Sequence, residues 1–152
     1  MKGHLKNLLN IAVVFSLSMA LGFATNNQIV INGIVLVFII HWLLYIPANI
    51  FKTEKFYDLT GSLSYISVIS YILYSKVQDF ESGIGEVVIS LAIIIWSARL
   101  GTFLFLRIKK DGEDKRFREF KKSWSKFLVA WTTSGMWVTI CSACAMTAVA
   151  SE

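Results

Sequence analysis

Five long apolar stretches run along the sequence, and short polar or charged segments separate them. Each stretch is comparable to the roughly 20 residues that an α-helix needs to cross a bilayer. The apolar residues form continuous runs and do not alternate with polar ones, which excludes membrane-spanning strands. The pattern therefore predicts an all-α integral membrane bundle of five transmembrane helices, at about residues 8–25, 29–50, 58–75, 84–108 and 127–150.

We expect residues 1–152 to form a single transmembrane domain, because five spans leave little room for a soluble one. The first span has an alternative interpretation as a cleaved signal peptide, since Lys2 and Lys6 precede it and residues 22–24 are small or apolar. However, its apolar run is long for a signal peptide, and only residues 26–28 separate it from the next span. A helical hairpin is the simpler interpretation.

Composition and charge define the class and the topology of the protein. The chain is 55% hydrophobic and 16% charged, with a net charge of +5. This balance excludes a soluble enzyme and a disordered chain, and it points to anionic lipid as a partner, not to nucleic acid. Thirteen of the 15 lysines and arginines lie in three segments that five spans place on one side. The positive-inside rule then predicts a multi-pass protein with a cytoplasmic N-terminus and an external C-terminus. The opposite side has Lys76, Asp79, Glu81 and Glu152.

The connection at residues 109–126 combines basic and aromatic residues. After a turn signal at Asp111-Gly112, four aromatic residues recur at helical spacing: Phe117, Phe120, Trp124 and Phe127. Lysines and arginines fill the other positions, so we predict a cytoplasmic, basic amphipathic helix that lies at the membrane interface between the fourth and fifth spans. This helix would anchor on anionic lipid or, alternatively, cradle the phosphates of a nucleotide or lipid.

The third span carries polar residues that share one helical face. Thr60, Ser64, Ser67 and Tyr71 are spaced by four, three and four residues. This face is either a helix-packing seam or the polar wall of an intramembrane cavity. Asp58, where the chain enters the span, is either a helix N-cap or a carboxylate at the mouth of a site.

Arg99 lies within the fourth span, about 12 Å along the helix from Arg107. A charge at this depth is costly, so it pairs with another group, extends to the interface or contacts a ligand. The third and fourth spans should be antiparallel neighbours, and we therefore predict that Asp58 and Arg99 share a polar cluster, directly or through Ser62 or a tyrosine. The candidate residues of a substrate cavity are Asp58, Ser64, Tyr71 and Arg99.

Other chemically active residues in the spans favour structural interpretations. His41 is expected to be hydrogen-bonded within the bundle, and no metal site is predicted because no second ligand lies at a suitable spacing. Cys141 and Cys144 have CxxC spacing, but they lie on an apolar, small-residue helix, which favours core packing. The sequence contains no GxGxxG, P-loop or HExxH motif.

Two stretches resemble one protein family. Residues 56–62, Phe-Tyr-Asp-Leu-Thr-Gly-Ser, resemble the "F-x-D-L-T-G-S" segment of a large uncharacterised membrane family related to steroid 5-alpha-reductases. Residues 99–117 are similar to the family's "R-L-G-x-x-L-x-x-R-x-x-x-x-G-x-D-x-R-F" stretch, and Trp131 and residues 135–137 are similar to the family's next segment. The resemblance covers about residues 56–137, with matching order and spacing.

The resemblance implies NADPH-dependent reduction of a carbon–carbon double bond conjugated to a ketone, in a steroid or other lipid-like enone. It places Asp58 and Arg99 at the substrate cavity, and Lys109, Asp114 and Arg116 on the cofactor side. The family's C-terminal half carries an "S-R-H-P-N-Y-x-G-E" segment linked to cofactor binding, which these 152 residues lack. We therefore expect an N-terminal, substrate-binding half that needs a missing C-terminal half or partner subunit. The alternative is a non-enzymatic membrane protein that binds lipid or another subunit.

Overall fold

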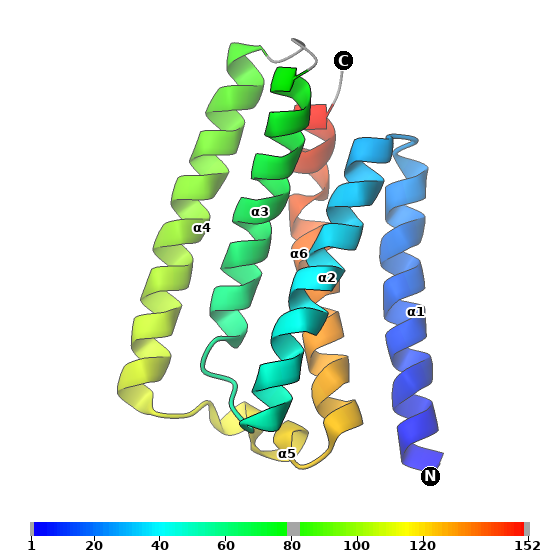
Figure 1. Ribbon diagram of the computed structural model, residues 1–152, viewed down its shortest axis with the longest axis vertical. Coiled ribbons are helices and arrows are strands. Elements are labelled where there is room, and N and C mark those ends of the chain that lie inside the picture. The colour runs from blue at the N-terminus through cyan, green and yellow to red at the C-terminus, as the bar shows by residue number, and fades with distance from the viewer. Residues whose placement is uncertain (1, 79–82, 151–152) are drawn as a thin grey trace.

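The computed structural model describes residues 2–78 and 83–150, and within them the chain is a bundle of helices without strands (Figure 1). The all-α prediction is confirmed. The long helices are α1 (Lys2–Ala24), α2 (Gln28–Ile50), α3 (Tyr57–Gln78), α4 (Ile84–Asp111) and α6 (Trp124–Ala150). The short helices η1 (Lys115–Phe117) and α5 (Arg118–Lys121) connect α4 to α6.

Four of the described helices are long and apolar enough to cross a membrane, which makes the chain a multi-pass integral membrane protein. These segments are Gly3–Ala24, Gln28–Ile50, Ile84–Asp111 and Trp124–Ala150. The predicted number of five is wrong by this measure, because the fifth long helix, α3, contains too many polar residues. α3 contacts α2, α4 and α6, and its Thr60, Ser62 and Ser64 are buried. Neighbouring helices therefore cover these three of the polar residues that lower its hydropathy.

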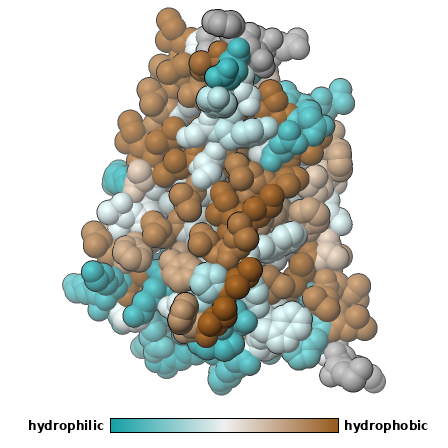
Figure 2. All heavy atoms as spheres, viewed as in Figure 1, coloured by the Kyte–Doolittle hydropathy of each residue, from teal (hydrophilic) through white to brown (hydrophobic). Residues whose placement is uncertain are grey.

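The surface of the bundle is suited to contact with a lipid bilayer. Large apolar side chains such as Leu17, Ile95 and Trp137 are exposed. Figure 2 shows apolar residues over the middle of the face in view and hydrophilic residues gathered at the end that carries α5. Removing such side chains from water is favourable, so this exposed apolar surface is the one that lipid covers.

The interior of the bundle has two apolar clusters. The larger one lies between α2, α3 and α6, where Ile34, Phe38, Val68 and Met146 are almost completely buried. Gly135 permits this packing, because a Cβ atom there would lie 3.2 Å from the Phe38 ring. The second cluster is mainly aromatic and lies near α5. Its buried members are Ala48, Phe117, Phe127 and Trp131.

The connection between α1 and α2 is the tight helical hairpin that the sequence predicts. Asn26 has a positive φ of 50°, a conformation that asparagine adopts more readily than most residues. Asn27 is the N-cap of α2, and its side chain accepts hydrogen bonds from the backbone N–H groups of Ile29 (2.9 Å) and Val30 (3.3 Å).

Residues 109–126 do not form the single amphipathic helix that we predicted. α4 continues to Asp111 and ends at Gly112, whose φ of 83° confirms the predicted turn. Only the short helices η1 and α5 follow before α6 begins. Phe117 turns inward against Tyr57 and Phe127 and is buried, so part of the predicted interfacial face belongs to the aromatic cluster.

The start of α1 and the α5 segment lie at one end of the bundle, and α6 ends at the other (Figure 1). We call the first of these the basic end, because it carries residues 2–6, 52–55 and 107–126. Three of the charged residues that the sequence places on the opposite side of the membrane, Asp79, Glu81 and Glu152, lie outside the described part of the chain.

Candidate functional site

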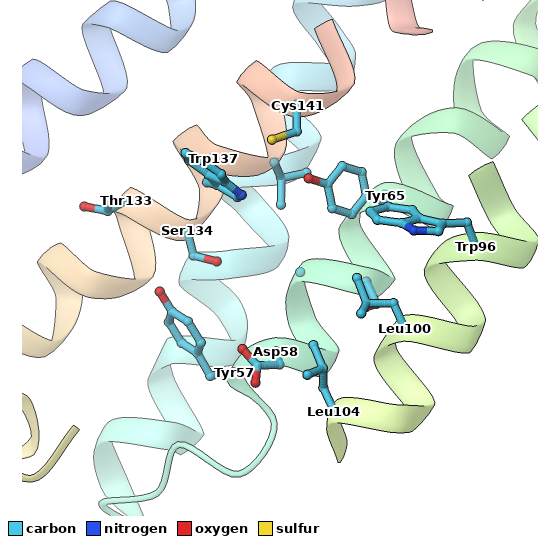
Figure 3. A pocket seen from close by; sticks show the side chains of 13 residues that line it. Tyr57, Asp58, Tyr65, Trp96, Leu100, Leu104, Thr133, Ser134, Trp137 and Cys141 are labelled. Atoms are coloured by element: carbon cyan, nitrogen blue, oxygen red, sulfur yellow. The ribbon is translucent and has the colours of Figure 1, made fainter. Parts of the chain in front are cut away.

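A cavity of about 660 Å³ lies between α3, α4 and α6 (Figure 3). Each helix contributes residues spaced three or four apart, which places them on one helical face. The lining residues of α3 are Tyr57, Asp58, Gly61, Ser62 and Tyr65. Those of α4 are Trp96, Leu100 and Leu104, and those of α6 are Thr133, Ser134, Trp137, Val138 and Cys141.

The cavity is polar at one end and apolar along most of its length. Tyr57 and Asp58 lie at the end nearer the basic end of the bundle, with Ser134 next to Tyr57, and Trp96, Trp137 and Cys141 lie toward the opposite end (Figure 3). Such a lining is typical of a site that covers an apolar body and orients one polar group.

The mouth of the cavity lies between α4 and α6. Trp96 and Trp137 line the cavity and yet are 47% and 66% exposed. Both stand on helices that are apolar enough to span a membrane. The cavity therefore opens sideways, toward the surface that lipid covers.

Asp58 is the predicted candidate that the structure places in this cavity. It lies within the first turn of α3, which begins at Tyr57, so it is not the N-cap. Its Oδ2 atom forms an ion pair with Arg107 Nη2 at 3.8 Å, and the Asp58 and Arg107 side chains are 30% and 48% exposed. A weak ion pair at the edge of the cavity thus holds the carboxylate.

Arg99 does not join Asp58, and the predicted polar cluster between them is wrong. The Arg99 side chain is exposed and lies in a separate hollow of about 310 Å³ with Trp96, Leu100 and Phe103, all on α4. None of the described residues forms an ion pair or hydrogen bond with it. The antiparallel arrangement of α3 and α4 was correctly predicted, but it brings Arg107 to Asp58, two turns beyond Arg99.

Ser64 and Tyr71 lie outside the cavity lining and face α2. Ser64 is fully buried, donates a hydrogen bond to the Thr60 carbonyl (2.9 Å) and lies 3.3 Å from His41 Nδ1. Tyr71 Oη accepts a hydrogen bond from Asn32 Nδ2 at 3.3 Å. The polar stripe that the sequence singles out is therefore the packing seam between α2 and α3.

His41 is hydrogen-bonded within the bundle, as predicted, and it also supports the wall of the cavity. It is fully buried, and its Nδ1 atom lies 2.9 Å from the Val37 carbonyl oxygen. Its Nε2 atom lies 3.2 Å from the hydroxyl of Ser134, which lines the cavity. The buried imidazole thus fixes the orientation of a polar lining group.

The predicted cofactor-side residues lie at the basic end, where carboxylates pair with Arg107, Arg116, Arg118, Lys121 and Lys122. Arg116 forms a two-point ion pair with Asp114, with an Nη2–Oδ2 distance of 2.5 Å. The Arg116 guanidinium holds the pKa of the Asp114 carboxyl below its usual range. Arg118 pairs with Glu113 in the same way. Lys109 is exposed on the last turn of α4.

Glu54 is a buried carboxylate that the sequence pattern did not single out. Its Oε2 atom accepts from Lys121 Nζ at 2.6 Å, and its Oε1 atom accepts from the Asp114 backbone N–H at 2.8 Å. Only 2% of the Glu54 side chain is exposed. This residue ties the connection between α2 and α3 to η1 and α5.

The two cysteines are exposed and unpaired, so the prediction of core packing is wrong for them. Cys141 lines the cavity at the end opposite Asp58 (Figure 3). Within residues 2–78 and 83–150, no group of three or more His, Cys, Asp or Glu side chains is suitably placed for a metal ion.

The lining residues that were missed share a signal in the sequence. Ser134, Trp137 and Cys141 are spaced by three and four residues on α6, and Asp58, Ser62 and Tyr65 are spaced by four and three on α3. Each set is a mixed polar and aromatic stripe, a pattern that helices use for lining a site. Which stripe of a helix lines the cavity depends on how that helix is rotated about its own axis.

The comparison with protein families gives one match. The family described as "Protein of unknown function (DUF1295)" matches residues 44–152, which is more than half of the chain and includes every cavity residue. No curated protein and no solved structure matches.

Proposed function

Because this chain belongs to the DUF1295 family, whose function is unknown, we propose a function from its cavity: it binds a lipid-like substrate within the membrane, as the substrate-binding part of a reductase similar to the steroid 5-alpha-reductases. The observation that carries the proposal is the cavity between α3, α4 and α6. It is apolar along its length, polar at one end and open toward lipid.

The size and position of the cavity support a ligand that arrives from the bilayer. Its volume of about 660 Å³ lies within the range of small-molecule sites, which is roughly 300–1,000 Å³. A lipid-soluble molecule concentrates in the bilayer and reaches the mouth at Trp96 and Trp137 without crossing water. The two motifs that resemble the reductase relatives contribute Asp58 and Ser62 on α3 and Leu100 and Leu104 on α4.

The segment of the basic end that contains η1 and α5 does not fit the phosphates of NADPH by itself. A phosphate group needs cations that are not already neutralised, whereas Arg116, Arg118, Lys121 and Lys122 each pair with a carboxylate. The hollow that Lys115 and Arg116 line, of about 620 Å³, also contains three acidic side chains: Asp111, Glu113 and Asp114. We therefore propose that NADPH is bound mainly by groups of a further segment or partner subunit, and we assign no cofactor contact to these residues.

The proposed topology places the basic end in the cytoplasm and the end of α6 outside, with α3 as a fifth crossing that packs against α2, α4 and α6. The support is the concentration of basic residues at one end, which the positive-inside rule places on the cytoplasmic side. In this orientation the polar end of the cavity faces the cytoplasm.

A non-enzymatic lipid-binding protein is the second candidate. The ion pairs of the basic end favour it, because they occupy Arg116 and Arg118, two of the cations that could otherwise bind a phosphate. Both candidates require the same cavity, and they differ in whether a cofactor-binding partner joins the basic end.

A binding experiment tests the shared part of the proposal. Radiolabelled steroid enone is titrated against the purified chain in detergent micelles. The test variant is Leu100→Trp, which fills the cavity. The control variant is Leu91→Trp, which adds the same bulk on the lipid-exposed side of α4. We expect saturable binding that Leu100→Trp weakens at least about tenfold and Leu91→Trp leaves unchanged. Equal binding by both variants would contradict a ligand in this cavity.

NADPH fluorescence measured with the same protein separates the two parts of the proposal. We expect no micromolar binding by this chain alone, because carboxylates already pair with Arg116 and Arg118. Tight binding would show that the basic end does accept the cofactor and would overturn the proposed need for a partner.

A further inference from the structure

We infer that the polar end of the cavity consists of hydrogen-bond acceptors, and that it selects a lipid carrying a hydroxyl group as donor. This inference rests on the proposed function, since it specifies the class of lipid that the same cavity binds. The polar groups at that end are Tyr57, Asp58 and Ser134 (Figure 3). Whether each group can donate to a ligand depends on where its hydrogen atom already points.

The Tyr57 hydroxyl has already donated its hydrogen. Its oxygen lies 2.9 Å from the backbone carbonyl oxygen of Ala130. A carbonyl only accepts, so Tyr57 is the donor in this bond. The phenolic oxygen therefore presents lone pairs, and no hydrogen, to a ligand.

The Ser134 hydroxyl is committed in the same way through His41. The His41 Nδ1 atom lies 2.9 Å from the Val37 carbonyl oxygen, so Nδ1 carries a hydrogen. His41 is fully buried, and a charged imidazolium there would be costly, so the other ring nitrogen is an acceptor. Ser134 accordingly donates to Nε2 at 3.2 Å and leaves its oxygen lone pairs to the cavity.

Asp58 adds a carboxylate to these two oxygens. It forms an ion pair with Arg107, and a charged carboxylate accepts hydrogen bonds and donates none. A ketone oxygen placed against Tyr57, Ser134 and Asp58 would face lone pairs and a negative charge, because Arg107 lines a different hollow. A hydroxyl would instead donate to the carboxylate, and hydrogen bonds to charged groups are among the stronger ones.

The other groups of the lining that can donate belong to Ser62, Tyr65, Trp96, Thr133 and Trp137, and Thr133 already donates to the Val129 carbonyl. The indole N–H groups belong to Trp96 and Trp137 at the mouth, and Tyr65 interacts with Cys141 at the far end (Figure 3). Ser62 is nearly buried against Gly101 of α4. A substrate that carries both a hydroxyl and a ketone would therefore place its hydroxyl at Asp58 and its ketone toward Tyr65, Trp96 and Trp137.

The inference is tested with cholestanol and cholestanone, which carry a hydroxyl or a ketone at the same carbon and are otherwise alike. Tritiated cholestanol is bound to the purified chain at neutral pH, and each unlabelled steroid is used as competitor. We expect cholestanol to bind about fivefold or more tightly than cholestanone, since one satisfied hydrogen bond is the difference. Asp58→Asn removes the charge and adds a donor, so this ratio should fall toward one. Asp111→Asn, at the exposed end of α4 and outside the cavity, should preserve it.

The outcomes separate this inference from the proposed function. Equal or tighter binding of cholestanone to the unmodified chain would overturn the inference and leave a lipid-binding cavity in place. A preference for cholestanol that persists in Asp58→Asn would also overturn it, because the carboxylate would not be its source. If neither steroid binds, the proposed function fails together with the inference.

Discussion

Individual charged residues at the basic end differ in how the fold surrounds them. Glu54 is buried and bonded to both a lysine and a backbone N–H, whereas Glu119 forms its ion pair with Lys122 in solvent. Buried pairs are costly to break because the remaining charge is left without a partner, and exposed pairs contribute little. The same kind of interaction therefore has different consequences at these two positions.

Glu54→Gln should destabilise the protein by about 3 kcal/mol, because it leaves the mostly buried Lys121 ammonium without its counter-charge. Glu119→Gln is the matched control and should change stability little, since its partner remains hydrated. Thermal unfolding of both variants in detergent checks this expectation. Equal unfolding temperatures for the two variants would show that the Glu54 pair does not stabilise the fold.

At the scale of helices, α3 and α4 approach each other closely at a seam of small residues. Ser90, Ser97 and Gly101 on α4 are buried, with spacings of seven and four residues that keep them on one face. A Cβ atom at Gly101 would lie 2.6 Å from both Cβ and Oγ of Ser62. This contact sets the distance between the two helices that form one side of the cavity.

Gly101→Ala should separate α3 from α4 and destabilise the protein by about 1–2 kcal/mol, after allowing for the better helix propensity of alanine. Gly85→Ala on the same helix meets nothing within 4 Å and should be neutral or slightly stabilising. Chemical denaturation in mixed micelles measures both. A neutral Gly101→Ala variant would mean that the helices are not held at this distance.

The short helix η1 should depend on pH through its N-cap. Asp114 accepts from the Arg116 backbone N–H, and the Arg116 guanidinium lowers the pKa of its carboxyl. A lowered folded-state pKa means that its contribution is complete above the unfolded value, about 4, and is lost as the pH falls through the folded value. Pepsin cleavage within residues 112–123 should therefore be slower than in Asp114→Asn at about pH 4. The two rates should converge at lower pH, and a constant ratio would contradict this.

For the whole molecule, the proposed topology makes Lys115→Cys and Asp79→Cys accessible from opposite sides of the membrane. Cys141 and Cys144 are exposed, so both are first replaced by serine to remove background labelling. A membrane-impermeant maleimide applied to sealed vesicles reports each position. Labelling of both positions from the same side would mean that α4, the helix between them, does not cross, which would contradict the proposed topology and the four-span count alike.

The sequence was sufficient to predict most of the helices and their order. Apolar runs, the asparagines before α2 and the glycine after α4 act within a few residues of where they occur, so they are readable without a fold. The predicted interfacial helix failed because Phe117 packs against Tyr57, some 60 residues away in the chain. Local periodicity contains no information about such a partner.

The candidate site was predicted only in part, for the same physical reason. One residue along a helix changes direction by about 100°, so a stripe of polar residues identifies a face but not the neighbour it meets. Asp58 lies in the cavity, whereas Ser64 and Tyr71 face α2 and Arg99 faces outward.

The sequence by itself determined a membrane bundle with a basic end, because hydrophobic length and charge act through solvation of each segment. Only tertiary structure decided that Arg107 meets Asp58 and that His41 supports Ser134, because those contacts depend on the rotation and spacing of packed helices.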